Sequence, residues 1–229
     1  MSTLFIVPTP IGNLEDITLR ALRVLKESDI IACEDTRRSL KLLNYFGISK
    51  PLISFYSYNQ QYKIPQLIEK LLSGKKIALI SDGGTPAISD PGWLLLKEAI
   101  DKGIKTEVLP GACALTTALV GSGFNTDGFV FCGFLKRKKS KIKKELAEAG
   151  AMGKTIIFYE SPHRIIKTLE ICSEVFGDDA PVCIARELTK SFEEFIRGSC
   201  VEVIKKMKEK ETILGEITVL IGFYPAQKL

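Results

Sequence analysis

Short hydrophobic runs alternate along the chain with segments in which apolar positions recur at helical spacing. The run Ile30–Cys33 is apolar throughout, which is typical of a strand buried on both faces of a sheet. Within residues 17–27, by contrast, Leu19, Leu22 and Leu25 fall on one face of a helix. Strands that alternate with helices predict an α/β architecture.

The pattern can be followed over nearly the whole sequence. The expected strands are residues 4–7, 30–33, 52–55, 77–80, 106–109, 129–134, 155–159, 182–186, 195–200 and 216–223. The expected helices are residues 17–27, 36–46, 61–72, 93–102, 113–120, a helix that ends near 148, one that opens at Ser161-Pro162, and 201–210. We expect Asp16 and Ser161 to cap two of these helices.

The alternation is interrupted once, over residues 121–127, and then starts afresh. This break predicts two α/β domains, 1–121 and 122–229. The first domain would supply one half of a ligand site. The second would carry a basic segment, residues 136–144, between its first strand and first helix.

The composition is that of an ordinary soluble protein, with 45% hydrophobic and 26% charged residues among 229. No apolar run approaches the ~18 residues of a membrane span, and the first residues lack the basic flank of a signal peptide. The six cysteines form no CxxC pair and His163 is the one histidine, so the usual zinc spacings are absent. We therefore expect a cytoplasmic protein with reduced thiols and no metal or membrane.

Charge is concentrated in the basic segment 136–144. Its seven cations are Lys136, Arg137, Lys138, Lys139, Lys141, Lys143 and Lys144. Without them, the net charge of +5 becomes −2, so the rest of the protein is mildly acidic. Such a segment is either a solvated face or a contact for a polyanion.

Polar loops follow most of the expected strands, and ligands of open α/β sheets bind beyond strand carboxyl ends. Neither GxGxxG nor GxxxxGK[ST] occurs, which argues against a dinucleotide-binding Rossmann domain and against P-loop chemistry. The dipeptide Gly83-Gly84 would still let backbone approach a ligand closely. The loops begin at residues 8, 34, 81, 110, 160 and 187.

Five of these segments resemble the S-adenosylmethionine-dependent tetrapyrrole methylase superfamily, and within it the enzymes that methylate cytidine 2′-oxygens of 16S rRNA. The segments are residues 9–14 with 16–18, 33–37, 81–92, 158–164 and 186–190. The resemblance extends from about residue 4 to 222. It implies two α/β domains with the cofactor cleft between them, a homodimer, and a cytidine in the decoding region of 16S rRNA in the small subunit as substrate.

Matched by position, the resemblance also implies the residues that contact S-adenosylmethionine. These are Pro10, Ile11, Asp82, Gly84, Thr85, Ile88, Cys113, Ala114, Tyr159, Ala185 and Thr218. The loops that hold them carry little net charge, which suits a sulfonium ligand. Several of the apolar members could equally be plain core residues.

A ribose hydroxyl is a poor nucleophile, so a general base or a nearby cation would help the transfer. The candidates at strand ends are Glu34, Asp35, Glu187 and Lys190. Asp35 could instead cap a helix, and Glu187 could belong to a structural ion pair. The sequence does not choose among them, and positioning alone could suffice.

The expected RNA contacts are Arg37, Arg38, the seven cations of the basic segment, His163 and Arg164. Two other functions stay open. One is methylation of a corrin or porphyrin precursor by an enzyme of the same superfamily. The other is RNA binding without catalysis, as in an assembly factor.

Overall fold

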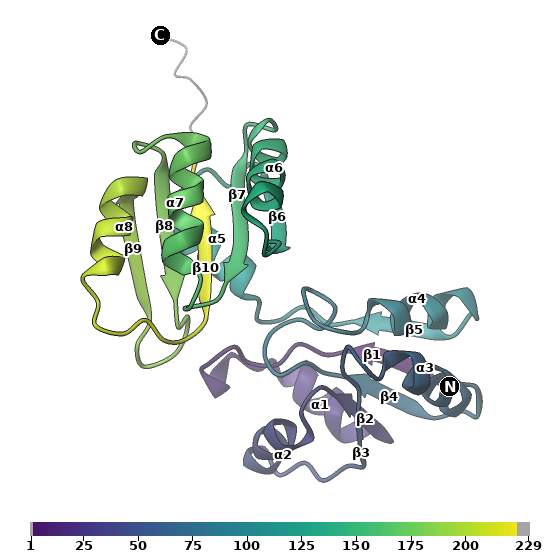
Figure 1. Cartoon of the computed structure of the whole chain (residues 1–229). Helices are drawn as coiled ribbons and strands as arrows, with labels where there is room; N and C mark the ends of the chain where they lie inside the picture. Colours follow the sequence, from purple (N-terminus) through teal and green to yellow (C-terminus); the bar gives the residue numbers. More distant parts are fainter. Residues whose placement is uncertain (1, 224–229) are drawn as a thin grey trace. The chain divides into compact units, whose positions relative to one another are not determined.

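The structure is a computed structural model that describes residues 2–223 of the chain. It divides into two compact units, with the boundary between Cys113 and Ala114. Each unit is built on its own five-stranded sheet (Figure 1). The expected α/β class and the expected pair of sheets are confirmed.

The first unit holds a sheet of parallel strands in the order β3-β2-β4-β1-β5. Its strands are β1 (Thr3–Ile6), β2 (Ile30–Cys33), β3 (Leu52–Ser54), β4 (Lys76–Leu79) and β5 (Lys105–Val108). Its α-helices are α1 (Leu19–Glu27), α2 (Thr36–Tyr45), α3 (Gln60–Leu72) and α4 (Trp93–Asp101). Because every pair is parallel, all five carboxyl ends lie at one edge of the sheet.

Helices cover both faces of this sheet. Leu67 of α3 and Leu95 of α4 pack with Ile77 on one face. Val24 of α1 and Leu43 of α2 pack against the other face. Alternate residues of the central strands β1, β2 and β4 therefore enter two separate apolar layers, which explains the apolar runs of these strands.

The ends of the first helices show how local chemistry sets them. Thr18, and not Asp16 as the sequence predicted, caps α1, since its side chain accepts from the Ala21 N–H at 3.0 Å. Asp16 instead ends a short 3-10 helix, Leu14–Asp16. Asp35 caps α2, and its carboxylate accepts from the Arg37 N–H at 2.8 Å.

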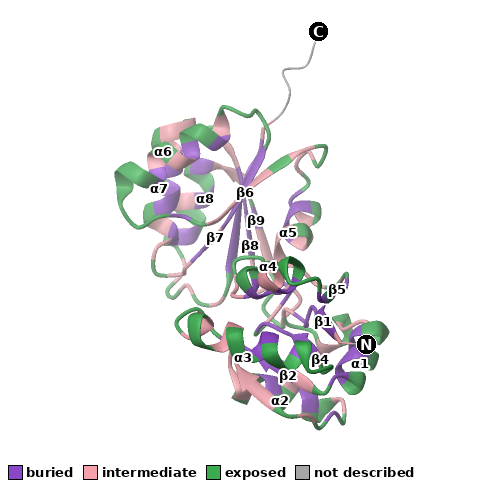
Figure 2. Ribbon diagram, turned by 90° about the vertical axis from the view of Figure 1, so that its right-hand side faces the viewer, coloured by how far each residue is buried: buried purple, intermediate pink, exposed green. Residues whose placement is uncertain are grey.

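The second unit holds a mixed sheet in the order β6-β7-β10-β8-β9. Its strands are β6 (Phe129–Phe134), β7 (Thr155–Glu160), β8 (Pro181–Arg186), β9 (Glu194–Ser199) and β10 (Ile217–Ile221). Its helices are α5 (Ala114–Ser122), α6 (Lys139–Gly150), α7 (Ile165–Phe176) and α8 (Cys200–Lys208). Helices α6, α7 and α8 cover one face and α5 covers the other (Figure 2).

The core of this unit lies between the sheet and the three helices. Phe158 of β7, Leu169 of α7 and Val203 of α8 are fully buried in one apolar cluster. The central strands are buried along most of their length (Figure 2). These buried central strands fix the positions of the loops at their ends, where we expect the functional residues of this unit.

Helix α5 explains why the observed boundary precedes the expected one at residue 121. The helix packs on β8, β9 and β10, so it belongs to the second unit although it precedes the break in the sequence pattern. Arg197 of β9 donates to the carbonyls of Gly121 and Ser122, at 3.1 Å for Ser122, and so ends the helix. The break at 121–127 marks the end of α5 rather than the boundary between the two units.

One helix start was predicted wrongly. Ser161 does not cap α7, because residues 161–164 form a turn in which the Ser161 carbonyl accepts from the N–H groups of Arg164 and Ile165. The Ser161 hydroxyl accepts from the His163 N–H at 3.2 Å. His163 therefore lies in this turn, before the first helical residue, Ile165.

Gly121 tests the packing of α5 on the sheet. A Cβ at this position would overlap the Phe195 ring of β9. Helix propensity alone makes Gly121→Ala stabilising by about 1 kcal/mol, but overpacking costs about 1–3 kcal/mol. We therefore expect Gly121→Ala to lower the urea midpoint, measured by far-UV circular dichroism. In a protein that also carries Phe195→Leu, Gly121→Ala should lower the urea midpoint less. If Gly121→Ala alone raised the midpoint, this packing would be contradicted.

Candidate active site

The loops at the carboxyl edge of the first sheet are joined by backbone hydrogen bonds. Thr9 and Gly84 form an antiparallel bridge, with N···O distances of 3.0 and 2.9 Å. The buried Thr9 hydroxyl also donates to the Ser81 carbonyl at 3.1 Å. The loop after β1 and the loop after β4 therefore form one rigid element.

The loop after β5 packs against the same pair. The Thr85 hydroxyl donates to the Ala112 carbonyl at 3.1 Å. At Gly111, an added Cβ would come within 2.5 Å of Pro8 Cβ, so only glycine permits this approach. The structure thus brings together the expected cofactor residues of this unit. They are Pro10, Ile11, Asp82, Gly84, Thr85, Ile88 and Cys113, which lie in these three loops.

Gly84 sits where a side chain would fill the space between these loops. Its φ of +87° is disfavoured for residues with a Cβ. An added Cβ would lie 3.3 Å from Ile11 Cγ2 and 3.6 Å from the Ala112 oxygen. Gly84 is buried and has no side chain to fill this space, which fits the close approach of backbone to a ligand.

Two residues in the β4–α4 loop carry backbone strain. Ala87 and Ser89 have φ values of 69° and 64°, a region that residues with a Cβ rarely adopt. Between them, Ile88 exposes 39% of its surface. Sequence reasoning missed this strain, since neither residue type signals a positive φ. Strain of this kind clusters at ligand-binding loops and supports the assignment of a site here.

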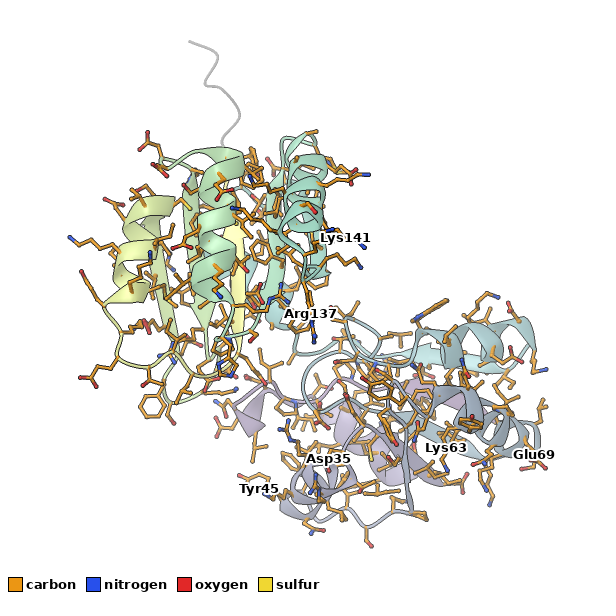
Figure 3. The ribbon with its side chains drawn as sticks, in the orientation of Figure 1. Asp35, Tyr45, Lys63, Glu69, Arg137 and Lys141 are labelled. Carbon is orange, nitrogen blue, oxygen red and sulfur yellow. The ribbon has the colours of Figure 1, made fainter. Side chains whose placement is uncertain are left out.

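Asp82 ties the loop after β2 to this group. One of its carboxylate oxygens accepts from the Asp35 N–H at 3.1 Å, and the other pairs with Arg38 at 3.2 Å. Asp82 therefore has a clear structural role beside any contact with the cofactor. The loop that it holds contains two of the candidates for acid–base chemistry, Glu34 and Asp35, of which Figure 3 labels Asp35.

The pKa values of the two neighbouring carboxylates are shifted in opposite directions. Hydrogen bonds from the Arg37 side chain and backbone hold the pKa of Asp35 down at about 2. Burial, with the negative charges of Asp82 and Asp35, raises the pKa of Glu34. Asp35 is the helix cap that the sequence allowed as an alternative, and Glu34 is the better proton acceptor of the two.

In the second unit, Tyr159, Thr218 and Ala185 stand side by side on three adjacent strands. Thr218 of β10 is paired with Tyr159 of β7 and with Ala185 of β8. Paired residues point to the same face of a sheet, so these three expected cofactor contacts share one row. Ala114, the fourth in this unit, begins α5 on that face of the sheet.

Two aromatic side chains that the sequence reasoning missed flank this row. The Phe131 ring lies edge-on to the Tyr159 ring at 5.0 Å, and the Phe134 ring lies at 5.5 Å. The alternation of Phe129 and Phe131 along β6 was a usable signal for the first ring, whereas Phe134 reaches Tyr159 through the register shift between residues 131 and 134, which the sequence does not show. Ala185 and Thr218 are buried, so the accessible part of this surface is aromatic, formed by half-buried Tyr159 and exposed Phe134.

Glu187 and Lys190 lie together in the loop between β8 and β9. Lys190 Nζ is 2.8 Å from Glu187 Oε1 and 3.1 Å from Glu216 Oε2. The Lys190 hydrogen bond, with that of the Glu216 N–H, lowers the pKa of Glu187. Hydrogen bonds to both carboxylates raise the pKa of Lys190 although burial opposes this. The pair is fixed and charged, so Glu187 is a weaker base candidate than Glu34.

Arg186 pairs elsewhere. Its guanidinium contacts Glu194 at 3.0 Å and donates to the Leu214 carbonyl at 3.0 Å. Arg186 and Glu187 therefore do not pair with each other. Each belongs to a structural ion pair of its own, Arg186 with Glu194 and Glu187 with Lys190. The backbone of Glu187 is also strained, with a φ of 51°.

The basic segment begins where β6 ends. Lys139 and Lys143 share the carboxylate of Glu174 at 2.6 Å each, and Lys144 is 3.8 Å from Glu148. Within residues 2–223, Lys138 and Lys141 form no ion pair. Arg137 and Lys141 extend outward near the start of α6 (Figure 3).

Arg164 forms hydrogen bonds to the backbone at the start of this segment. Its guanidinium donates to the carbonyls of Leu135 and Lys136, at 3.2 and 3.0 Å, and pairs with Glu160 at 3.2 Å. Glu160 is itself buried and accepts from the Thr168 hydroxyl at 2.6 Å. Arg164 thus holds the start of the basic segment in place, whereas His163 is exposed.

In the described part of the chain, no group of three histidine, cysteine, aspartate or glutamate side chains is arranged to hold a metal ion. None of the helices in residues 2–223 has the length and apolar character that crossing a membrane requires.

Comparisons with known proteins show the family of the chain. The sequence model of the family Tetrapyrrole (Corrin/Porphyrin) Methylases matches residues 3–204. A ribosomal RNA small subunit methyltransferase I of Halalkalibacterium halodurans is 48% identical over 219 residues, 96% of this chain and 75% of that protein. The protein of the same name from Thermotoga maritima is 47% identical over 222 residues, 97% of this chain and 99% of that protein.

Solved structures share the fold at much lower identity. A diphthine synthase matches with a TM-score of 0.75 and 17% identity, covering 96% of this chain and 90% of that one. Uroporphyrin-III C-methyl transferase from Thermus thermophilus, complexed with S-adenyl homocysteine, matches with a TM-score of 0.65 and 16% identity, covering 96% and 97%. The resemblance noted in the sequence is confirmed: the chain belongs to the tetrapyrrole (corrin/porphyrin) methylase family and groups within it with the ribosomal RNA small subunit methyltransferases I.

Proposed function

We propose that the protein transfers a methyl group from S-adenosylmethionine to the 2′-hydroxyl of a cytidine in the decoding region of 16S rRNA. The observation that carries the proposal is the identity of 47–48% to rRNA methyltransferases, which extends over 96–97% of the chain and so through both sets of loops. We further propose that it acts in the cytoplasm, as a homodimer, on the small ribosomal subunit.

The cofactor would lie against the joined loops of the first unit. When bound, S-adenosylmethionine supplies a methyl group on a sulfonium, which is already electrophilic. The chain has to orient this group and keep the approach to it open, and the Thr9–Gly84 bridge fixes the loop geometry for that task. The row Tyr159–Thr218–Ala185 stays a prediction for further cofactor contacts.

Glu34 is the residue we propose to accept the proton of the ribose hydroxyl. Its carboxylate is half-buried, and its pKa is raised by burial and by two neighbouring aspartates. A base whose pKa lies nearer the working pH accepts a proton more readily. Asp35, Glu187 and Lys190 would then support the loops, and Lys190 could still bind a phosphate.

Tetrapyrrole methylation is the second candidate, because several solved structures of this fold are tetrapyrrole methyltransferases. Their identity of 16% shows the fold alone. The deciding experiment offers labelled S-adenosylmethionine with undermethylated small subunits or with a tetrapyrrole precursor. We expect label in the RNA only; label in the precursor would support the second candidate, and no transfer at all would support a binding protein.

Gly84 tests the cofactor site. At 100 times its dissociation constant, S-adenosylmethionine should stabilise the wild type by about 2.7 kcal/mol, seen as a raised melting temperature. Gly84→Ala should weaken this stabilisation and Gly84→Val should abolish it, because each side chain fills the space beside Ile11. Gly103→Val is the matched control, since it has a φ of +67° but nothing within 4 Å of its Cβ. Equal cofactor affinity in the Gly84 and Gly103 variants would place the site elsewhere.

The carboxylates can be ranked by rate. We expect Glu34→Gln to lower turnover by ~10²-fold with little change in cofactor affinity, and Glu187→Gln to lower it less. Because the pKa of Glu34 is raised, the wild-type rate should fall on acidification at a higher pH than an ordinary glutamate would give. Glu34→Gln should lack this acidic limb in the pH–rate profile. A profile unchanged in Glu34→Gln would mean that orientation, without a carboxylate base, supports the transfer.

The basic segment can be tested by salt dependence. Each phosphate contact adds roughly 0.7–0.9 to the slope of log K against log salt. Lys138 and Lys141 have no carboxylate partner within residues 2–223, so changing both to Gln should flatten the slope by about 1.5. Lys139→Gln with Lys143→Gln removes the same charge from the same basic segment, but from side chains that share the carboxylate of Glu174, which offsets one of their two charges. If the two double variants had equal slopes, the role of the unpaired lysines would be contradicted. If neither variant changed the slope, the basic segment would be a solvated face.

A further inference from the structure

Three exposed tyrosines lie close together in the sequence, two in the turn that joins β3 to α3 and one in the first turn of α3. Tyr56, Tyr58 and Tyr62 are 41%, 91% and 74% exposed. Single exposed apolar residues are common on soluble proteins, but three aromatic rings within one short segment make a patch. We call residues 56–62 the tyrosine turn.

The tyrosine turn is held by groups other than its rings. The Asn59 side chain accepts from the Tyr56 N–H at 2.9 Å and donates to the Ser54 carbonyl at 3.1 Å, so it bridges both arms. Phe55 is fully buried and anchors the turn to the core. The rings of Tyr58 and Tyr62 are therefore presented on a preformed backbone without contributing to the fold.

The register of the sheet places this turn beside the proposed active site. Ser54, the last residue of β3, is opposite Cys33, the last residue of β2. The Phe55 N–H then donates to the Cys33 carbonyl at 2.8 Å. The tyrosine turn therefore leaves the sheet next to the loop that carries Glu34, at the carboxyl edge where the cofactor loops lie.

Cations accompany the rings, but their charge is partly neutralised. The side chains of Arg37 and Arg38 are 87% and 67% exposed, and each pairs with an aspartate, Asp35 or Asp82. Their guanidinium groups are thus held in place at the surface, while the net attraction for phosphate is weak. Exposed planar groups whose charge is already offset by a carboxylate are suited to stacking on bases rather than to binding the backbone.

We propose that the tyrosine turn, with Arg37 and Arg38, stacks unpaired bases of a single-stranded RNA segment next to the methylated ribose. The inference rests on the proposed function and adds a division of labour. The basic segment supplies the salt-dependent attraction to phosphates, and the tyrosine turn supplies contacts to bases that salt screens little. A ribose can be methylated only where its nucleotide is accessible, which fits a single-stranded target.

The test compares rings with matched aliphatic side chains. The probe is a single-stranded RNA oligonucleotide that contains one 2-aminopurine, whose fluorescence is quenched when it stacks. We expect the double variant Tyr58→Leu/Tyr62→Leu to bind this RNA at least fivefold more weakly per ring, with less quenching. Its slope of log K against log salt should equal that of the wild type, which separates stacking from phosphate binding.

Two controls belong to the same experiment. Tyr58→Phe/Tyr62→Phe keeps the rings and should keep the affinity. Tyr45→Leu removes an exposed tyrosine outside the tyrosine turn, at the end of α2. Tyr45 lies eight residues beyond Arg37, or about 12 Å of helix rise, so this change should leave RNA affinity and quenching as in the wild type. All variants should keep the wild-type cofactor-induced rise in melting temperature, which shows that the first unit is folded.

The possible failures are distinguishable. If the wild type methylates small subunits and the Leu variants bind the oligonucleotide as the wild type does, the inference is wrong and the proposed function stands. If the Leu variants lose self-association in sedimentation but keep RNA affinity, the surface joins two copies and the inference is wrong. If the wild type neither binds RNA nor methylates small subunits, the proposed function fails and the inference fails with it.

Discussion

The proposed active site depends on the backbone bridge between Thr9 and Gly84. The bridge joins loops that are about 75 residues apart in the sequence and can form only because β1 and β4 are neighbouring parallel strands. Once it is made, the loop after β5 packs on it through Thr85 and Gly111. Any side chain at Gly84 would enter the same space, so a single residue keeps the loops joined and the space open.

Electrostatics then separates residues that look alike in the sequence. Asp35 and Glu34 are adjacent, yet an arginine lowers the pKa of the first and burial raises the pKa of the second. The lysines of the basic segment divide in the same way, because Lys139 and Lys143 share the carboxylate of Glu174 and Lys141 does not contact it. Function in this protein therefore depends on which charged groups are left without a partner or are desolvated.

The sequence predicted the elements well, because the central strands are strong apolar runs and most helices are followed closely by a glycine. Strands Ile30–Cys33 and Phe129–Phe134 were predicted to the residue. The start of α7 was wrong because Ser161 satisfies a turn instead of a helix, and the domain boundary was displaced because α5 packs on strands that come much later in the chain. The strained φ of Ala87 and the partner of Glu187 could not be predicted, since both depend on tertiary contacts.

The central claim concerns which atom receives the methyl group. Undermethylated small subunits would be incubated with labelled S-adenosylmethionine and the protein, and the RNA then digested to nucleosides and analysed by mass spectrometry. The account predicts a single labelled product, 2′-O-methylcytidine, at one position of 16S rRNA. Label on a base, or on the ribose of another nucleoside, would contradict it.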